Sequence, residues 1–598
     1  MISTKFQSLS QNNTMLNWTK MLRATPLLFG LMLSLDENPA QAEVPIRPAN
    51  PLHYQIAVNS NQDGPITPDL VLTLREAIAL TNGDIIFEML SDAERLQVQV
   101  LPAEQGSMIG SDLPPSSTTI YLQSLLPPLR QAGLRLNGLS FDGSSRVTLA
   151  PAESVELPIG LLAMADDITI QGFNFQGFYS DRATIYADHP FVGGVVVSTG
   201  QMLYDLGRLA DVVQLSPPKN VAIAMNQFGE AATAETASTF GVVLFEAEQA
   251  TIAGNQFFHQ NSSAILTGKI ATDFKIYDNV FTENGANGLG HAIHLGGDID
   301  RGHVMQNRFC RNHGAGVFMF KPQGAIAVEN NLFYGNGFPP EDSQISAAST
   351  QTKVAAVYLM NSQHQVINNL IMNQNGAGVV VAAYPRSEGN RIQDNLFGEL
   401  QGLSIDLVAR ESTGIYDYRS GDGPNPSRDS HNRKLDTANG GVNAPRFAGL
   451  EFFPFGDRVL ISGTADPGVT VDLYQVLESE GYFGPLNRFM LQTIADEEGH
   501  FEIYLNDWQL GDRLSAIATD PHFGTSEPAE NAVIRSLNGP ASMVLQENNN
   551  LSTDPHFGTS EPAENAVIRS LNSPASMVLQ ENNNLSIVIP RQCGLASQ

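Results

Sequence analysis

The chain is poor in cysteine and in positive charge. Its 598 residues include only two cysteines, Cys310 and Cys593, and a disulfide framework cannot be read from two cysteines that lie so far apart. Lys and Arg total 33 against 62 Asp and Glu, which gives a formal net charge of −29. Nucleic acids and anionic membranes are bound through basic patches, so this composition argues against both as partners.

Long apolar runs are also scarce. The run near the N-terminus, from Leu27 to Leu35, is too short to span a membrane. Lys20 and Arg23 precede it and Ala40-Gln-Ala42 follows it, which is the pattern of a secretory signal peptide cleaved after Ala42. We therefore expect a secreted, extracellular or cell-surface protein whose mature chain has no membrane span. The periplasm is an alternative location, and a buried core helix is the alternative structure for the run.

What the chain does contain is a repeat. An Asn-x-Phe triplet or a close variant recurs between residues 226 and 397, at intervals of 24 to 38 residues. The repeated asparagines are Asn226, Asn255, Asn279, Asn307, Asn331, Asn369 and Asn395. A unit of roughly 20–30 residues indicates a solenoid, in which each coil buries the apolar side chains of its neighbours.

Each unit also holds a short apolar strand. Gly241-Val-Val-Leu244, Ala292-Ile-His-Leu295 and Gly316-Val-Phe-Met319 alternate with period two and are too short for helices. Short strands broken by Asn and Gly predict a parallel β-helix. Stacked coils would align the asparagines in an amide ladder and the phenylalanines in an internal stack. The alternative is a β-sandwich in which the triplets recur by chance.

Two further regions resemble a known family. Leu72-Thr-Leu-Arg-Glu-Ala-Ile78 and Asp84-Ile-Ile-Phe87 resemble the segment that opens many bacterial secreted and surface proteins with right-handed parallel β-helix repeats, similar to those of pectate lyases. Gly402-Leu-Ser-Ile-Asp406, Asp422-Gly-Pro-Asn425 and Asn443-Ala-Pro445 resemble the loop that ends their helix. The resemblance spans about residues 54–535. It implies an all-β fold with a right-handed parallel β-helix, and it implies little about activity.

Flanking regions surround this solenoid. Thr73-Leu-Arg-Glu76 has capping-box spacing, which predicts a short helix that covers the first coil. After the repeats, short strands such as Phe501-Glu-Ile-Tyr-Leu505 predict a small antiparallel sandwich, and Ile461-Ser-Gly-Thr-Ala-Asp-Pro-Gly468 resembles bacterial immunoglobulin-like modules. The expected regions are a signal peptide at 1–42, a cap with irregular first coils at 43–160, the β-helix at 161–410, a linker or long loop at 411–445, the sandwich at 446–552 and a duplicated tail at 553–598.

The tail carries a near-identical duplication. Thr519–Ser552 is repeated as Thr553–Ser586 with one difference, Gly539 against Ser573. Such identity indicates a recent tandem duplication or an assembly error. One copy can complete the edge of the sandwich, so the second copy is expected to be peripheral or disordered.

One column of residues predicts a binding surface. The middle residue of each apolar-x-apolar strand is expected to point outward, and successive coils lie about 4.8 Å apart. His294, Phe318 and Tyr358 would then form an exposed strip on which sugar rings could stack, and they are the predicted substrate-binding residues. The alternative is that the insertion at 338–353 folds over the strip and makes it a satellite core.

A polar cluster lies beside this strip. It consists of His291, His294, Asp298, Asp300, Arg301, His303 and His313. Paired carboxylates, or an imidazole beside a carboxylate, can perform acid–base or glycosidic chemistry, and a lyase also needs a cation to stabilise its intermediate. The candidate catalytic residues are Asp298, Asp300 and His294. His291 and His294 lack the third ligand of a zinc motif. The alternative is a solvated turn between coils.

A metal is not required by any motif. Asp422, Asp429 and Asp436 could offer oxygen ligands to Ca²⁺, although their spacing matches no known loop and a solvated linker is the alternative. No other cofactor is expected.

Two functions are consistent with these patterns. The first is a secreted or cell-surface β-helix protein, monomeric and non-catalytic, that binds or adheres to a polysaccharide or another cell-surface polymer. The alternative is a carbohydrate-active enzyme, a polysaccharide lyase or glycoside hydrolase acting along the β-helix groove. Fold cannot decide between them, because function resides in sites. The absence of carboxylates and basic residues that converge across neighbouring coils favours the first.

Overall fold

The computed structural model describes residues 53–101, 105–113, 118–139, 145–180, 192–201, 216–230, 237–286, 290–339, 354–383, 386–409, 421–428, 430, 437–478, 481–536, 578–581, 584–587 and 593. All of them belong to one compact unit, Pro51–Gln598. The predicted signal peptide lies outside the described residues, as do parts of the predicted linker and most of the second copy of the duplication.

A short helix begins the described chain after the first strand. Helix α1 (Leu74–Asn82) starts at Thr73, whose side chain accepts a hydrogen bond from the Glu76 N–H in a capping box. The helix ends at Gly83, which adopts φ +75°, a conformation that favours glycine. The apolar side chains of α1 are buried in the main core, so the helix covers the first coils as predicted. The short helices η1 (Phe87–Met89) and α2 (Asp92–Arg95) follow.

The coils form three long sheets whose strands are parallel, apart from the antiparallel pair of β1 and β2. Sheet A consists, in spatial order, of β2 (Val98–Leu101), β1 (His53–Val58), β3 (Met108–Ser111), β5 (Arg135–Asn137), β8 (Thr169–Gln171), β11 (Ala222–Ala224), β14 (Thr251–Ala253), β17 (Lys275–Tyr277), β20 (Gly302–Met305), β23 (Ile326–Glu329), β26 (Gln365–Ile367) and β29 (Arg391–Gln393). Sheet B consists of β4 (Thr119–Leu122), β6 (Thr148–Pro151), β9 (Asn174–Phe175), β12 (Gln227–Phe228), β15 (Gln256–Phe258), β18 (Val280–Thr282), β21 (Arg308–Cys310), β24 (Leu332–Tyr334), β27 (Leu370–Gln374) and β30 (Leu396–Leu400). Sheet C consists of β7 (Ile159–Ala163), β10 (Gly193–Val197), β13 (Val242–Glu248), β16 (Ile265–Thr272), β19 (Ile293–Leu295), β22 (Val317–Met319), β25 (Val357–Leu359), β28 (Val379–Val381) and β31 (Ile405–Leu407).

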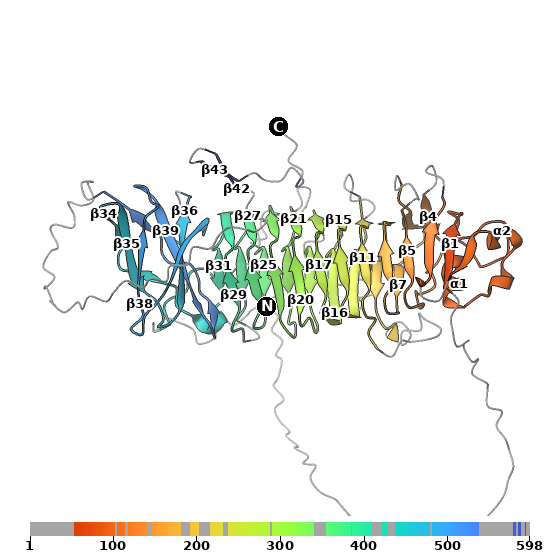
Figure 1. The fold of residues 1–598 in the computed structure, drawn as a ribbon, viewed down its shortest axis with the longest axis horizontal. Helices are drawn as coiled ribbons and strands as arrows, with labels where there is room; N and C mark the ends of the chain where they lie inside the picture. Colours follow the sequence, from red (N-terminus) through yellow and green to blue (C-terminus); the bar gives the residue numbers. More distant parts are fainter. Residues whose placement is uncertain are drawn as a thin grey trace, which may run out of the picture. The chain divides into compact units, whose positions relative to one another are not determined.

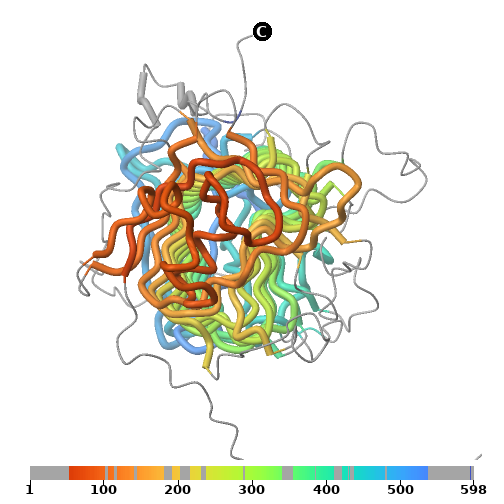
Figure 2. Tube along the Cα trace, turned by 90° about the vertical axis from the view of Figure 1, so that its right-hand side faces the viewer, coloured from red at the N-terminus to blue at the C-terminus, as the bar shows by residue number. Residues whose placement is uncertain are grey.

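This topology is a right-handed parallel β-helix, as predicted. From β7 to β31 each coil gives one strand to each sheet, and the strands of consecutive coils pair side by side (Figure 1). Viewed along the stack, the coils lie over one another around a common interior (Figure 2). The predicted period reflects this stacking, because each Asn-x-Phe triplet enters a strand of sheet B.

The interior is built from two kinds of stacked side chain. The phenylalanines of sheet B form a continuous stack, Phe175, Phe228, Phe257, Phe281, Phe309 and Phe333, with ring centroids 4.6 to 5.0 Å apart. The seven repeated asparagines are buried and form a ladder at the turn between sheets A and B, in which each side-chain amide donates to the Oδ1 of the next. The asparagine ladder satisfies backbone groups that the turn would otherwise leave unpaired, and the phenylalanine rings fill the interior.

A second ladder lies at the turn between sheets B and C. Asn284 donates from Nδ2 to Asn312 Oδ1 at 2.9 Å, and Asn312 donates likewise to Asn336 at 2.9 Å. The sequence pattern did not predict this ladder, although Asn284 and Asn336 each precede a glycine. In the coils of these three asparagines, two corners are therefore fixed by buried amides.

An antiparallel β-sandwich follows the last coil. Its first sheet consists of β32 (Arg446–Phe447), β34 (Pro454–Phe455), β35 (Arg458–Thr464) and β38 (His500–Leu505). Its second sheet consists of β33 (Glu451–Phe452), β36 (Thr470–Val476), β37 (Arg488–Ile494), β39 (Arg513–Asp520), β40 (Gly524–Thr525) and β41 (Ala532–Ile534). The sandwich has its own buried core, centred on residues such as Val471, Leu473 and Ile503. A short helix η4 (Ala438–Gly441) precedes it, and the strands β42 (Val578–Glu581) and β43 (Asn584–Ile587) pair near the C-terminus.

The sandwich is bonded directly to the last coil. The N–H of Thr525 donates to the carbonyl of Asn390 at 3.0 Å, and the Thr525 hydroxyl accepts from the Ile392 N–H at 2.9 Å. The first copy of the duplication supplies β40 and β41, so it forms part of this junction. Across the described ranges, no helix is long and apolar enough to cross a membrane.

Candidate functional site

The predicted binding strip lies on the outer face of sheet C, where β19, β22 and β25 pair in register. His294 pairs with Phe318, and Phe318 pairs with Tyr358. The rings of Phe318 and Tyr358 stack with centroids 5.0 Å apart. However, Phe318 and Tyr358 are only 2% and 1% exposed. The prediction that these two residues form an exposed strip is therefore wrong.

A second apolar cluster lies on the outer face of sheet C. Phe318 and Tyr358 belong to a cluster with Val354, Ala355 and Met360, separate from the interior core. A similar cluster covers the N-terminal part of the same face, around Val196 and Val243. Satellite cores thus lie at both ends of this face, whereas the alternative expectation was a single satellite core beneath the insertion at 338–353. Most of the insertion at 338–353 lies outside the described residues.

His294 lies between these two clusters and is half-buried. Its ring meets the Phe318 ring edge-on, with centroids 5.2 Å apart. His291 is fully buried: its Nδ1 accepts from the Ala315 N–H at 3.0 Å, and its ring stacks on Phe318 with centroids 4.1 Å apart. The two histidines therefore pack into the satellite core with Phe318.

Asp298, Asp300 and Arg301 form a turn between sheets C and A. Asp298 Oδ1 accepts from the N–H of Asp300 at 3.3 Å, and Asp300 Oδ1 accepts from the N–H of Ala325 at 3.2 Å. Arg301 donates from Nε and Nη2 to the two carboxylate oxygens of Asp273, both at 2.7 Å. This bidentate hydrogen bond lowers the pKa of Asp273 and raises that of Arg301 above its already high value.

The remaining histidines of the cluster are elsewhere. His303 lies on β20 in sheet A, paired with Lys275 and Ala327. His313 lies at the turn after sheet B, where its Nδ1 bonds the Phe338 carbonyl at 3.0 Å and burial lowers its pKa. The structure therefore brings together His291 and His294, and separately Asp298, Asp300 and Arg301. The described contacts of Asp298 and Asp300 are hydrogen bonds from backbone N–H groups, and that of Arg301 is an ion pair with Asp273.

Of the three predicted Ca²⁺ ligands, only Asp422 is among the described residues. Asp429 and Asp436 lie outside the described residues, whereas Asp422 lies beside two buried carboxylates, Asp406 and Glu527. Asp422 Oδ2 accepts from the Ala409 N–H at 3.0 Å. Across the described ranges, no group of three or more His, Cys, Asp or Glu side chains is arranged to hold a metal ion.

These buried carboxylates are held by donors at the junction of β-helix and sandwich. Asp406 accepts from the N–H groups of Asp422 and Gly423, each at 3.1 Å. Glu527 accepts from the N–H of Leu407 at 3.0 Å and from the side chain of Asn425 at 2.9 Å. Burial raises the pKa of Asp406 to about 7 and that of Glu527 to about 8, and the neighbouring carboxylates act in the same direction.

An aromatic surface that sequence reasoning missed lies on the sandwich. On the outer face of its first sheet, Leu460 of β35 pairs directly with Tyr504 of β38, and Phe455 of β34 pairs with Arg458. Phe455, Tyr504 and Leu460 are 86%, 42% and 38% exposed. The Arg458 guanidinium lies over the Tyr504 ring, 5.2 Å from its centroid. We call these four residues the sandwich platform.

The platform is bordered by a tryptophan. Trp508 is half-buried against the sandwich core, and its Nε1 donates to the carbonyl of Asp457 at 3.0 Å, at the hairpin between Phe455 and Arg458. The alternation of Phe501-Glu-Ile-Tyr-Leu505 was a signal that could have placed Tyr504 on the solvent side. The exposure of Phe455 had no such signal, because it depends on what covers the hairpin.

A family model agrees with the fold of the coils. The family model "Right handed beta helix region" matches residues 221–397. The enzymatically active domain of bacteriophage CBA120 tailspike protein 2 is similar at 14% identity, with 70% of this chain and 69% of that chain covered and a TM-score of 0.33. A DFA-IIIase from Arthrobacter chlorophenolicus A6 is similar at 12% identity, with 60% and 88% covered and a TM-score of 0.35. A periplasmic alginate epimerase is similar at 12% identity, with 53% and 67% covered and a TM-score of 0.30. No curated protein matches the chain.

Proposed function

We propose that the protein is an exported, non-catalytic binding protein that holds a polysaccharide on the sandwich platform. The observation that carries this proposal is the exposure of Phe455, Tyr504 and Leu460 on neighbouring strands of one sheet face. Exposed apolar groups that cluster, rather than occur singly, are typical of binding surfaces. The fold does not need them there, because the same strands bury Val459, Ile461 and Ile503 in the sandwich core.

The chemistry of the platform suits a sugar ring. The flat C–H face of a pyranose packs on an aromatic ring, which removes apolar surface from water and leaves the hydroxyl groups at the edge free to hydrogen-bond. Arg458, which lies over Tyr504, offers several fixed N–H donors to such hydroxyls. Aromatic and arginine side chains together also contribute most of the affinity in many binding surfaces.

The charge of the chain favours an uncharged polymer. A formal net charge of −29 repels a polyanion, and this repulsion is screened only beyond a Debye length of about 8 Å at physiological salt. Arg458 is the one cation within the sandwich platform. We therefore favour a neutral glycan over a uronate or sulfated polymer.

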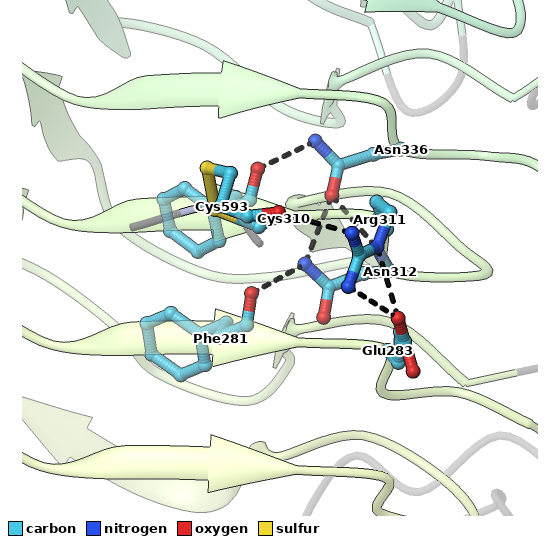
Figure 3. Close-up of a disulfide and its surroundings, with 8 residues drawn as sticks. Phe281, Glu283, Cys310, Arg311, Asn312, Asn336 and Cys593 are labelled. Carbon is cyan, nitrogen blue, oxygen red and sulfur yellow. Dashed lines mark hydrogen bonds and ion pairs between the residues drawn. A yellow bond between two sulfur atoms is a disulfide. The ribbon is translucent and has the colours of Figure 1, made fainter. Parts of the chain in front are cut away.

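Export is supported by the pairing of the two cysteines. Cys310 and Cys593 form a disulfide (Figure 3), and disulfides persist mainly in oxidising compartments outside the cytoplasm. The signal-like N-terminus is consistent with that location. We further propose that the exported protein is monomeric, which sedimentation of the purified chain would test.

The enzyme alternative has less support. Asp298 and Asp300 accept backbone hydrogen bonds, and Arg301 is paired with Asp273. Their described contacts therefore account for this turn without a substrate. His294, the remaining candidate, packs against Phe318.

The test is a glycan array on the chain from Glu43 onward, with and without Ca²⁺, followed by mass spectrometry of the bound glycans. Trp508 is the only tryptophan after Trp18, so its fluorescence reports on binding next to the platform. Tyr504→Ala is expected to weaken binding at least tenfold. Tyr482→Ala removes another exposed tyrosine of the sandwich, 77% accessible, and should leave binding unchanged.

Other outcomes would reject the proposal. Shortened or unsaturated glycans, abolished by Asp298→Ala or His294→Ala, would make the protein an enzyme. Binding that both tyrosine variants retain would move the site off the platform. No binding to any glycan would remove the carbohydrate ligand altogether.

A further inference from the structure

The sandwich platform is continuous with a row of polar residues on the same sheet face. Beyond Leu460 and Tyr504, the next outward residues of β35 and β38 are Ser462 and Glu502, which pair directly with each other. A third outward pair follows, and β32 adds one residue beside it. We call this set the polar row: Ser462, Glu502, Thr464, His500 and Arg446. Successive outward residues of a strand lie about 7 Å apart, so the polar row extends the platform by roughly 14 Å.

Glu502 is the exposed acceptor at the centre of this face. Among the residues that the structure describes, no hydrogen bond or ion pair engages its carboxylate, whereas the imidazole of His500 lies 3.7 Å from the carboxylate of Asp496. Glu is less common in strands than Val, Thr or Tyr, so the stability of the sheet does not account for its place. Its two oxygens offer about four acceptor sites to a ligand.

A carboxylate in this position suits the hydroxyl groups of a sugar. A hydrogen bond from a hydroxyl to an ionised carboxylate is stronger than one between two neutral groups. Ser462 and Glu502 follow directly after Leu460 and Tyr504 along the same two strands. A glycan with one ring on the sandwich platform therefore has the next part of its chain over this pair. Arg446, at the far end of the polar row, adds N–H donors.

The same carboxylate acts against an acidic ligand. A uronate or sulfate group over the polar row would place a second negative charge beside Glu502, and like charges across a binding surface disfavour that partner. Arg446 lies on β32, two strands away from Glu502, and the two are not paired. The charge of Glu502 is therefore complementary to a neutral, hydroxyl-rich chain.

We propose that Glu502 is a specificity-determining residue of the glycan site, which selects a neutral linear glycan over an acidic one. The inference rests on the proposed function, because it needs a sugar ring on the sandwich platform. The continuity of the polar row with the platform and the negative charge of Glu502 identify the occupant as a neutral chain of more than one ring. The net charge of the protein acts on any polyanion, whereas Glu502 acts only on the part of the ligand that lies over the polar row.

Calorimetric titration of the chain from Glu43 with matched pairs of probes tests this role. Each pair is a neutral hexasaccharide, namely cellohexaose, laminarihexaose or mannohexaose, and the same chain oxidised to carboxylates at C6. In low salt, the wild type should bind the neutral member more tightly. Glu502→Gln removes the charge and keeps the size of the side chain. It should shift the ratio of the two affinities about threefold toward the acidic member, which is the size expected for one exposed charge pair.

The matched control is Glu530→Gln. Glu530 is exposed and lies just before β41 of the second sheet, so its loss changes the net charge equally without touching the polar row. This variant should keep the wild-type ratio of affinities. A shift confined to Glu502→Gln, and smaller in high salt, supports the inference, because salt screens exposed charges.

Three results would overturn the role of Glu502. If Tyr504→Ala weakens binding of a neutral probe but Glu502→Gln keeps the wild-type ratio, the sandwich platform stands and Glu502 does not select. A shift that Glu530→Gln reproduces would assign the selection to the net charge of the protein. If the wild type binds none of the three neutral probes, the inference fails, and the glycan array decides separately on the proposed function.

Discussion

The side chain of Asn279 donates a hydrogen bond to Oδ1 of Asn307, one coil further on, at 3.0 Å. The backbone N–H of Asn279 donates to the same oxygen, also at 3.0 Å. From the other side, the Oδ1 of Asn279 accepts both the N–H and the amide of Asn255. Each amide of the ladder thus satisfies backbone and side-chain groups of the neighbouring coils at a turn that excludes water.

Asn279→Ala should therefore be strongly destabilising. It removes the Asn279 partner from the backbone N–H of Asn255 and from the carbonyl of Ile252, while the side chain of Asn255 keeps only its bond to the Ile223 carbonyl. Each buried group left unpaired costs about 1–3 kcal/mol. We expect the midpoint of urea unfolding to fall clearly. Gln365→Ala, an exposed change on β26, is the control and should leave the midpoint in place. Equal midpoints for the two variants would mean that the ladder contributes nothing to stability.

Truncation of Phe281 in the phenylalanine stack is expected to be strongly destabilising. Its ring is fully buried, with the rings of Phe257 and Phe309 each 4.9 Å away. Phe281→Ala should cost about 3–5 kcal/mol because the rigid coils cannot collapse into the cavity. Phe281→Leu fills most of that volume and should cost less. Urea unfolding of both variants checks the order, and a leucine variant as unstable as the alanine variant would argue against a cavity effect.

The interior was predictable because it repeats. The Asn-x-Phe triplet recurs with every coil, so a local pattern determines the stacks of Asn279 and Phe281. The outer layers do not repeat. Phe318 and Tyr358 alternate like surface residues, yet they are buried in a second apolar cluster on the outside of sheet C. A face of a strand that another segment covers looks the same in sequence as a face in water.

The same reason limits prediction of the candidate sites. Cys310 and Cys593 meet although 283 positions separate them, and no spacing rule connects them. Asp406 and Glu527 meet only because the sandwich is bonded to the last coil. The polar cluster around His294 was assembled from neighbours in sequence, and the turn distributes those neighbours among different sheets.

The junction carboxylates predict a dependence of stability on pH. Asp406 and Glu527 are buried beside Asp422, with Asn425 as the neighbouring neutral donor, and their pKa values are raised to about 7 and about 8. A carboxyl whose pKa is higher in the folded state binds more protons there than in the unfolded chain. The contribution of such a carboxyl to the free energy of unfolding is therefore fully present below about pH 4 and is lost as the pH rises through 7 to 8.

We expect the melting temperature to fall by several degrees between pH 5 and pH 9. Glu527→Gln should flatten this slope, even if the lost hydrogen bond lowers the melting temperature at every pH. Glu530→Gln, an exposed change three residues away, should keep the wild-type slope and so corrects for the general repulsion of a chain with net charge −29. Scanning calorimetry between pH 5 and pH 9 measures the melting temperature of the wild type and of both variants. Parallel slopes of melting temperature against pH for all three would assign the pH effect to the surface charges.

The duplication should be dispensable. Deleting residues 553–586 joins Ser552 to Ile587 and recreates the same local sequence, because Ser586 is the counterpart of Ser552. The strands β40 and β41, which complete the sandwich, come from the first copy and are retained. The chain between the sandwich and Cys593, shortened to roughly 25 residues, can still extend to about 80 Å, so it reaches Cys310 and lowers the entropy cost of closing the loop. We expect an unchanged melting temperature and the Cys310–Cys593 peptide pair in the mass spectrum.

Deleting residues 519–552 instead gives a chain that differs from the first deletion at one position, Ser573 in place of Gly539, and should behave identically. A melting temperature several degrees lower in both deletions would show that the second copy packs on the fold.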